Sequence, residues 1–328
     1  MEKQPVTIYY SKLKQKDDKE ILALKQAFET WGFAYLDLTD QKDDSGSLLC
    51  NMEKAFYVAK QFFSLDKQEK VKFDIDKIGP YKLNGYKPIG RNAGVSKETR
   101  DGFEAYLLPR NGLCTPPHDA TALDMPSPML QHAESLKELL NSLHTIGLEI
   151  LGCLRRPDND EHLVNRHRPS ETSTSAFAFL KYPLLSAECG ELGQYAHTDV
   201  GSLTILFFSE RGLQVLNPTG TEWQYLDPKE GCALLNVGDC LRFLSNGLYR
   251  SSLHRVVPFP GVAIQDRYSC AYFMRPELDV EFVDDDGNKW NSLDWHINKY
   301  HVFRASVDEQ AKSSVLTGRP GVLGLWEG

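Results

Sequence analysis

The chain has 328 residues, of which 41% are apolar, and its formal net charge is −8. This length and composition suit a large buried core, whereas an acidic balance without a Lys/Arg stripe argues against a nucleic-acid partner. No apolar run is long enough to span a bilayer and residues 1–5 do not open a signal peptide, so we expect a cytoplasmic protein without a membrane partner. The seven cysteines are odd in number and lack C-x-x-C spacing, which is typical of reduced thiols.

The N-terminal third is predicted to be mainly helical. Apolar residues at helical spacing indicate a helix that Gly32 ends, with a buried face made of Ile21, Leu24, Phe28 and Trp31. Residues 33–36 follow as the first strand. A second helix is marked by Met52, Phe56, Ala59 and Phe63. A third is expected to begin at Ser64, whose hydroxyl can cap it.

The longest predicted helix lies in the middle of the chain. It is expected to begin at Ser127-Pro128, a cap followed by proline in the first turn. Its core face is made of Leu136, Leu139, Leu140, Leu143, Ile146 and Ile150. We expect one structural unit with four parts: an N-terminal region over 1–125, this helix over 126–155, a β-rich core over 175–285 and a C-terminal segment over 286–328.

Short strands separated by glycine and asparagine turns characterise the second half of the chain. The predicted strands are residues 203–207, 212–216, 223–226, 233–237 and 241–244. This spacing is typical of an antiparallel sandwich or barrel. Segments that are distant in the sequence can converge inside such a fold.

A His-x-Asp triplet precedes the first of these strands. His197 and Asp199 are two residues apart, so in an extended chain their side chains point the same way. With His254 from a later strand, two imidazoles and one carboxylate could bind one face of a divalent transition metal and leave the opposite face open to reactants. The alternative is that these are ordinary residues of half-buried strands, but the β-rich context favours the metal site.

Arg267 and Ser269 form a second candidate site on one face of a strand that Ala271 and Phe273 continue. A guanidinium beside a hydroxyl suits a carboxylate, because both groups donate hydrogen bonds to it. Directed toward the metal, the pair could hold the far carboxylate of a short dicarboxylic acid whose other end chelates the ion. Alternatively, Arg267 is an ordinary strand arginine paired with one of the 45 acidic residues.

The chain resembles the non-haem iron, 2-oxoglutarate-dependent dioxygenases of the isopenicillin N synthase-like superfamily. The most specific stretches read "YAHTDVGSLTILF", "GLQVLN", "NVGDCLRFLSNGLYRSSLHRVV" and "RYSCAYF". Others resemble that family's amino-terminal region and read "AFETWGFAYLDL", "FFSLDKQEKVKF", "NGYKPIG" and "DGFEAYLL". The resemblance implies a mainly β fold with flanking helices, in which a helical N-terminal region braces a double-stranded β-helix (jelly-roll) core. It also implies that Fe(II) is bound by His197, Asp199 and His254, and 2-oxoglutarate by Arg267, Ser269 and Tyr182.

Two departures from the family pattern stand out. Many relatives place an asparagine two residues before Tyr182, where this chain has Leu180, so we expect one polar contact near the cosubstrate to be missing. The spacing from His254 to Arg267 is also longer than usual, and residues 258–261 are predicted to widen a hairpin. Neither departure removes a metal ligand.

The resemblance implies an enzyme that uses O₂ and 2-oxoglutarate, releases succinate and CO₂, and hydroxylates, desaturates or cyclises a small organic molecule such as a secondary metabolite. Ascorbate is a candidate activator, and the predicted substrate contacts are Phe273, Leu203 and Tyr106. One alternative is an Fe(II)/O₂ oxidase of the same fold, whose Arg267 and Ser269 would hold the substrate's own carboxylate. Another is a non-catalytic binding module. The sequence does not specify the oligomeric state.

Other charged residues are predicted to be solvated. For His162 and His167, which lie five apart beside arginines, a surface loop or helix end is favoured over a second metal site. Lys87, Arg91 and Arg100 could approach the mouth of the barrel and bind an acidic substrate, but solvated surface charge is the favoured interpretation.

Overall fold

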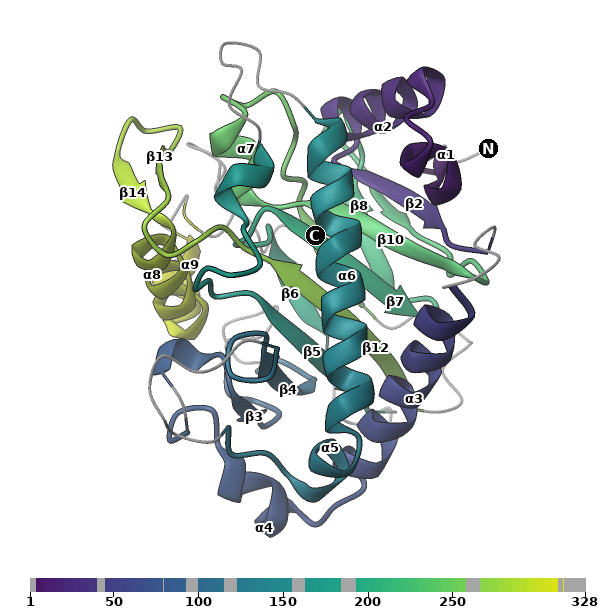
Figure 1. Cartoon of the computed structure of the whole chain (residues 1–328). Coiled ribbons are helices and arrows are strands. Elements are labelled where there is room, and N and C mark those ends of the chain that lie inside the picture. The colour runs from purple at the N-terminus through teal and green to yellow at the C-terminus, as the bar shows by residue number, and fades with distance from the viewer. Residues whose placement is uncertain are drawn as a thin grey trace.

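The computed structural model describes residues 4–39, 45–78, 80–92, 100–114, 123–154, 163–183, 193–257, 266–311 and 315. Two mainly antiparallel sheets form its core, and helices lie around them (Figure 1). Residues of both sheets line one pocket. The predicted mainly β core with flanking helices is therefore present. None of the described helices is long and apolar enough to cross a membrane.

The large sheet has the strand order β1-β2-β10-β7-β12-β5-β4-β3. Its strands are β1 (Thr7–Tyr9), β2 (Phe33–Asp37), β3 (Gly85–Lys87), β4 (Glu104–Pro109), β5 (Ala176–Tyr182), β7 (Leu203–Phe208), β10 (Cys232–Val237) and β12 (Arg267–Met274). Only β1 and β2 pair in parallel. Side chains alternate between the two faces of the sheet: in β12, Ala271 and Phe273 line the pocket, whereas Tyr272 and Met274 belong to the main core.

The small sheet has the strand order β6-β11-β8-β9. It consists of β6 (Gln194–His197), β11 (His254–Val256), β8 (Leu213–Leu216) and β9 (Trp223–Tyr225). A separate hairpin is formed by β13 (Glu281–Val283) and β14 (Lys289–Asn291). The pairing of β6 with β11 makes His197 and His254 direct neighbours across the small sheet.

The helix α6 (Ala133–Cys153) braces the large sheet and runs across it in Figure 1. All six residues of its predicted core face are buried. Gly147 lets the helix lie close to the sheet, because a Cβ at that position would be 2.4 Å from the sulfur of Met274 in β12. Helix α3 (Ser45–Phe63) packs against α6 and against β5 and β12. The other helices are α1 (Tyr10–Lys14), α2 (Asp18–Thr30), α4 (Lys67–Lys70), α5 (Ser127–Gln131), α7 (Asp239–Leu244), α8 (Ser292–Arg304) and α9 (Val307–Ala311), with short 3₁₀ turns at Val71–Phe73, Pro80–Lys82 and Leu163–Arg166.

The predicted start of the fold is confirmed with one addition. Helix α2 ends just before Gly32, which has a φ of +68°, and β2 follows directly. A Cβ at Gly32 would lie 2.0 Å from the carbonyl oxygen of Arg250, so glycine is required there by both φ and space. The short strand β1 was not predicted, because three residues carry too little periodicity to identify a strand.

The segment 241–244 was wrongly predicted as a strand and belongs to helix α7. Its residues are all buried, so they show no alternation between a core face and a solvent face. The backbone N–H groups of Asp239 and Cys240 donate to the carbonyl oxygens of Asp199 and Gly201, which fixes the first turn beside the His-x-Asp loop.

Two helix starts also differ from prediction. The predicted long helix is divided into α5 and α6, because His132 has a φ of −113° and a ψ of 17°, outside the helical range. Pro126, not Ser127, precedes the first helical residue. Ser64 does not cap α4 either, since its hydroxyl donates to the Gln61 carbonyl at the end of α3.

Candidate active site

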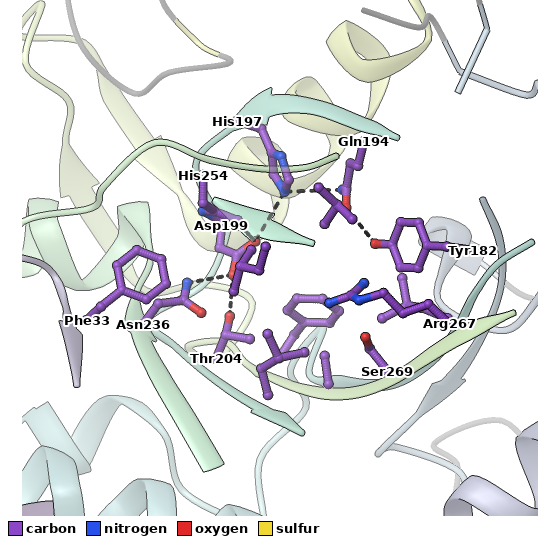
Figure 2. Close-up of a pocket in the computed structure, with 16 residues that line it drawn as sticks. Phe33, Tyr182, Gln194, His197, Asp199, Thr204, Asn236, His254, Arg267 and Ser269 are labelled. Carbon is purple, nitrogen blue, oxygen red and sulfur yellow. Dashed lines mark hydrogen bonds and ion pairs between the residues drawn. The ribbon is translucent and has the colours of Figure 1, made fainter. Parts of the chain in front are cut away.

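The three predicted metal ligands converge in the pocket between the sheets (Figure 2). His197 ends β6, His254 begins β11, and Asp199 follows two residues after β6. The Nε2 atoms of both histidines lie 3.8 Å from Oδ1 of Asp199. One ligand atom from each residue lies within 4.8 Å of the other two, and all three residues are buried. This spacing suits a single metal ion held between the three groups.

Backbone carbonyls orient both imidazoles. Nδ1 of His197 lies 2.9 Å from the carbonyl oxygen of Tyr195, and Nδ1 of His254 lies 3.2 Å from that of Ser252. An Nδ1–H donor on each ring leaves the Nε2 lone pair facing Asp199, as metal ligation requires. Burial, followed by the neighbouring His254, lowers the pKa of His197 to about 3, so this imidazole is neutral near pH 7.

Side chains of two neighbouring strands donate hydrogen bonds to the second carboxylate oxygen of Asp199. Oδ2 accepts hydrogen bonds from Thr204 Oγ1 of β7 at 2.5 Å and from Asn236 Nδ2 of β10 at 2.7 Å. Burial alone would raise the pKa of Asp199, but the two imidazoles and these hydrogen bonds hold it below its usual value. The carboxylate is therefore ionised, and Oδ1 is directed toward the histidines.

Arg267 and Ser269 lie on β12 at the other side of the same pocket (Figure 2). Nε of Arg267 donates to the carbonyl oxygen of Glu210 at 3.1 Å. Nη1 of Arg267 and Oγ of Ser269 are buried and have no hydrogen-bond partner among the described residues. Buried donors without acceptors are costly, so these two point to a ligand with an anionic oxygen.

Tyr182 and Gln194 connect the arginine side of the pocket to the histidine side. Tyr182 is the Cα partner of Arg267, whose guanidinium lies 4.9 Å from the centre of the tyrosine ring. Burial raises the pKa of Tyr182 to about 12, so its hydroxyl keeps its proton. That hydroxyl donates to Oε1 of Gln194 at 3.2 Å, and Nε2 of Gln194 lies 3.2 Å from Nε2 of His197.

The chain matches two family models. Residues 159–276 match the 2OG-Fe(II) oxygenase superfamily, and residues 6–122 match the N-terminal region of the non-haem dioxygenase in morphine synthesis. The chain is also 36% identical to 2-oxoglutarate-dependent dioxygenase gloE of Glarea lozoyensis over 94% of its own length and 90% of that protein. It belongs to the 2OG-Fe(II) oxygenase superfamily.

Further comparisons agree with this family. The oxygenase is 36% identical to 2-oxoglutarate-dependent dioxygenase ecdG of Aspergillus rugulosus, over 76% of this chain and 75% of that protein. Its fold is similar to that of full-length Neurospora crassa T7H in complex with alpha-KG, with a TM-score of 0.71 and 23% identity over 90% of this chain and 95% of that chain. The predicted jelly-roll fold, the 2-oxoglutarate-dependent dioxygenase activity, and the use of Fe(II) and 2-oxoglutarate are thus confirmed.

The structure brings only one of the three predicted substrate contacts into the pocket of the oxygenase. Phe273 lines it, but Leu203 and Tyr106 do not. Leu203 points into the main core because Thr204 and Leu206 take the pocket face of β7. Tyr106 is fully buried in that core, and its hydroxyl donates to Asn84 at 3.0 Å.

Several predictions about charged residues need correction. His167 is 1% exposed rather than at the surface, and its Nε2 lies 2.7 Å from the Ser202 hydroxyl. Lys87 is buried and paired with Asp101, while Arg91 is paired with Asp74 and Asp76. Arg100 is exposed, as predicted. His162 and the predicted hairpin at 258–261 lie outside the described residues.

Sequence reasoning missed three polar residues of the pocket. Asn236 had a detectable signal, since it is the one polar residue in the apolar run 233–237. Thr204 gave only a partial signal, because alternation in β7 places it opposite to Leu203 but does not say which of the two faces the pocket. Gln194 gave no signal, because its position beside Tyr182 depends on how β6 of the small sheet faces β5 of the large one.

Proposed function

We propose that His197, Asp199 and His254 hold Fe(II), and that Arg267, Ser269 and Tyr182 bind the far carboxylate of 2-oxoglutarate. The enzyme would use O₂ to hydroxylate, desaturate or cyclise a small organic molecule, releasing succinate and CO₂. The observation that carries this proposal is a single pocket with a two-histidine, one-carboxylate cluster on one side and two unpartnered buried donors on the other.

The residues fit the metal. Two neutral imidazoles and one carboxylate are a typical donor set for Fe(II) in oxygenases, and they leave further coordination positions open. When bound, the metal supplies the site for 2-oxoglutarate chelation and for activation of O₂. Thr204 and Asn236 support this site, because they hold Oδ2 of Asp199 and keep Oδ1 directed at the ion.

The residues also fit the keto acid. Arg267 supplies a guanidinium N–H and Ser269 a hydroxyl, neither of which has a partner among the described residues, and together they can satisfy one carboxylate. Tyr182 adds a protonated hydroxyl on the neighbouring strand. A dicarboxylic acid anchored at this end would place its keto acid end toward His197 and Asp199. The site would therefore select a keto acid of one length, because strand pairing fixes both the Arg267 end of the pocket and the metal ligands at the other end.

Gln194 is a further candidate for binding the keto acid. Its amide N–H lies 3.2 Å from the nitrogen of His197 that would ligate the metal, and its Oε1 is fixed by Tyr182. Metal binding would take that nitrogen, which leaves the amide N–H free to donate to a ligand oxygen beside it. The Gln194 amide would take the place of the asparagine amide that many relatives have at position 180, where Leu180 of this chain lines the pocket.

The remaining walls of the pocket suit an organic substrate. Apolar side chains from several strands line it, including Phe33, Leu206, Leu213 and Phe273. Among solved structures of similar fold, Neurospora crassa T7H is seen in complex with alpha-KG and thymine, a small molecule. A small substrate bound beside Phe273 would present its C–H bond to the metal side of the pocket.

We also propose the cytoplasm as compartment, since the described cysteines are free thiols, and ascorbate as an activator.

The test is anaerobic Fe(II) titration followed by turnover of 2-oxoglutarate. We expect one equivalent of iron, lost in His197→Ala and in Asp199→Ala, and succinate formed in step with substrate oxidation. O₂ consumption with substrate loss but without succinate would favour the oxidase alternative. Failure to bind stoichiometric iron would favour the non-catalytic module.

A further inference from the structure

The alternation of pocket-facing positions in β12 leads from Phe273 to Arg275, the residue directly after the end of the strand. Arg267, Ser269, Ala271 and Phe273 alternate along this face and line the pocket. Arg275 occupies the next position with the same alternation. Because Phe273 is the Cα partner of Thr204, which binds Asp199, Arg275 follows directly after the point where β12 passes the metal ligands.

Contacts place the Arg275 side chain beside the His-x-Asp loop. Its guanidinium lies 5.3 Å from the centre of the Phe273 ring. A Cβ at Gly201, two residues after Asp199, would lie 2.8 Å from Cγ of Arg275, so the arginine stem occupies the space that this glycine leaves. The backbone of Arg275 is fixed as well, because its N–H donates to the Ser175 hydroxyl.

Arg275 is a buried cation that has no carboxylate partner among the residues that the structure describes. It is 6% exposed, its Nη1 donates to the carbonyl oxygen of Thr174, and its Nε has no acceptor among the described residues. The nearby carboxylate of Asp199 acts on it only through space. The oxygens of Asp199 are engaged elsewhere, by Thr204, by Asn236 and, on the proposed function, by the metal. A buried guanidinium that lacks a carboxylate lowers the stability of the protein unless a ligand supplies an anionic group to pair with it.

Apart from Arg267, the other buried cations in the described part of the chain have partners within the protein that stabilise their charge. Lys70, Lys87, Arg242 and Lys299 each pair with a carboxylate. Arg110 has no carboxylate partner within the described ranges, but it donates to the carbonyl of Pro169 and the side-chain oxygen of Asn141. Arg267 and Arg275 differ from all of these, because neither has a carboxylate or a side-chain amide as its acceptor among the described residues, and each donates to one backbone carbonyl. Arg267 begins β12, and Arg275 directly follows its last residue.

Helix α8 adds polar groups next to Arg275. The charge of Arg275 acts on His296, whose Nε2 lies 2.9 Å from the Tyr81 carbonyl and whose Nδ1 is buried without a partner among the described residues. Tyr300, one helical turn later, is a second electrostatic neighbour. The Arg275 guanidinium, which lies close to the Phe273 ring, is therefore also within electrostatic range of polar groups of α8.

We propose that Arg275 binds a carboxylate of the substrate, so that the enzyme acts on a small organic acid. This inference rests on the proposed function and names the substrate class. Arg267 would hold the cosubstrate at one end of β12, and Arg275 would hold the substrate at the other. The cosubstrate and the substrate would then approach the metal site from opposite ends of β12.

The first test measures stability and needs no knowledge of the substrate. The full-length chain is supplied with Fe(II) under argon, and its Tm is compared with the Tm values of Arg275→Met and Arg110→Met. A buried guanidinium kept without a counter-ion destabilises the free enzyme, so Arg275→Met should keep or raise the Tm. Arg110→Met should lower it by several degrees, since Arg110 joins two segments by hydrogen bonds. A fall in Arg275→Met as large as that in Arg110→Met, or failure to fold, overturns the proposal.

The second test measures substrate class. Aliphatic, aromatic and amino acids, each paired with its primary amide, are supplied with saturating 2-oxoglutarate, and succinate is measured. We expect an acid to exceed its amide, and Arg275→Gln to lower kcat/KM for that acid by about tenfold or more, with Arg275→Lys retaining part of it. Calorimetry under argon should show 2-oxoglutarate affinity in Arg275→Gln within about twofold of wild type, because Arg267 is intact.

The outcomes separate the two proposals. A wild type that binds 2-oxoglutarate but turns over no acid, or prefers the amides, refutes the role of Arg275. So does unchanged acid turnover in Arg275→Gln. A wild type that binds neither Fe(II) nor 2-oxoglutarate refutes the proposed function instead, and the stability comparison with Arg110 still decides whether Arg275 is structural.

Discussion

Removing the Arg267 guanidinium should weaken 2-oxoglutarate binding far more than removing a surface arginine. Arg267 is 7% exposed, and one of its nitrogens has no partner among the described residues. Breaking a buried charge pair by deleting one partner costs about 3–5 kcal/mol. At about 1.4 kcal/mol per tenfold, Arg267→Ala should raise the Kd for 2-oxoglutarate by about a hundredfold to a few thousandfold, measured by calorimetry with Fe(II) under argon.

Two controls make this measurement specific. Arg211 lies on the surface, 43% exposed and paired with Asp227, so Arg211→Ala should change the Kd by less than about fivefold. A 2-keto acid that lacks the far carboxylate should bind wild type and Arg267→Ala equally, because the deleted contact is not made. A loss of less than tenfold for 2-oxoglutarate, or an equal loss for the truncated acid, would refute the assignment of Arg267.

Three further predictions concern stability and positioning. Lys299→Met leaves buried Asp239 without its cation and should cost about 3–5 kcal/mol in urea unfolding; a cost below about 1 kcal/mol would contradict this. Gln194→Leu should weaken 2-oxoglutarate binding by about 1 kcal/mol, whereas an unchanged Kd would exclude the amide contact. Burial lowers the pKa values of His144 and His167 to about 4, so below pH 6.5 the unfolded chain binds more protons. Each histidine should therefore remove about 2 kcal/mol of stability by pH 5, and equal denaturation midpoints at pH 7 and 5 would rule this out.

The parts of the site that could be predicted from the sequence depend on local geometry. His197 and Asp199 share a short segment, and Arg267 and Ser269 share one face of a strand, so spacing alone groups each pair. The apolar periodicity of α6 identified its core face for the same reason. The convergence of His254 with His197 was expected only because β-rich folds bring distant strands together, and the β6–β11 register now places the two histidines opposite each other.

The parts that could not be predicted depend on tertiary packing. The strand face of Leu203 could not be assigned without knowing which side of β7 meets α6 and which meets the pocket. Residues 241–244 read as a strand by composition, but the backbone N–H groups of Asp239 and Cys240 bond to the His-x-Asp loop and begin a helix there. Arg275 gave no signal either, because an arginine without a counter-ion is recognised only once its neighbours are known.

The geometry of the site depends on the register of β12 more than on any single residue. β12 pairs with β5 from Arg267 to Phe273 and with β7 from Ser269 to Met274. A shift of one residue would turn its pocket face toward α6 and its core face toward the pocket. Such a shift would place Tyr272 and Met274 in the pocket and both arginines in an apolar core. The long pairing on both sides of β12 thus fixes the distance from Arg267 to the metal ligands, and with it the length of the keto acid that can span them.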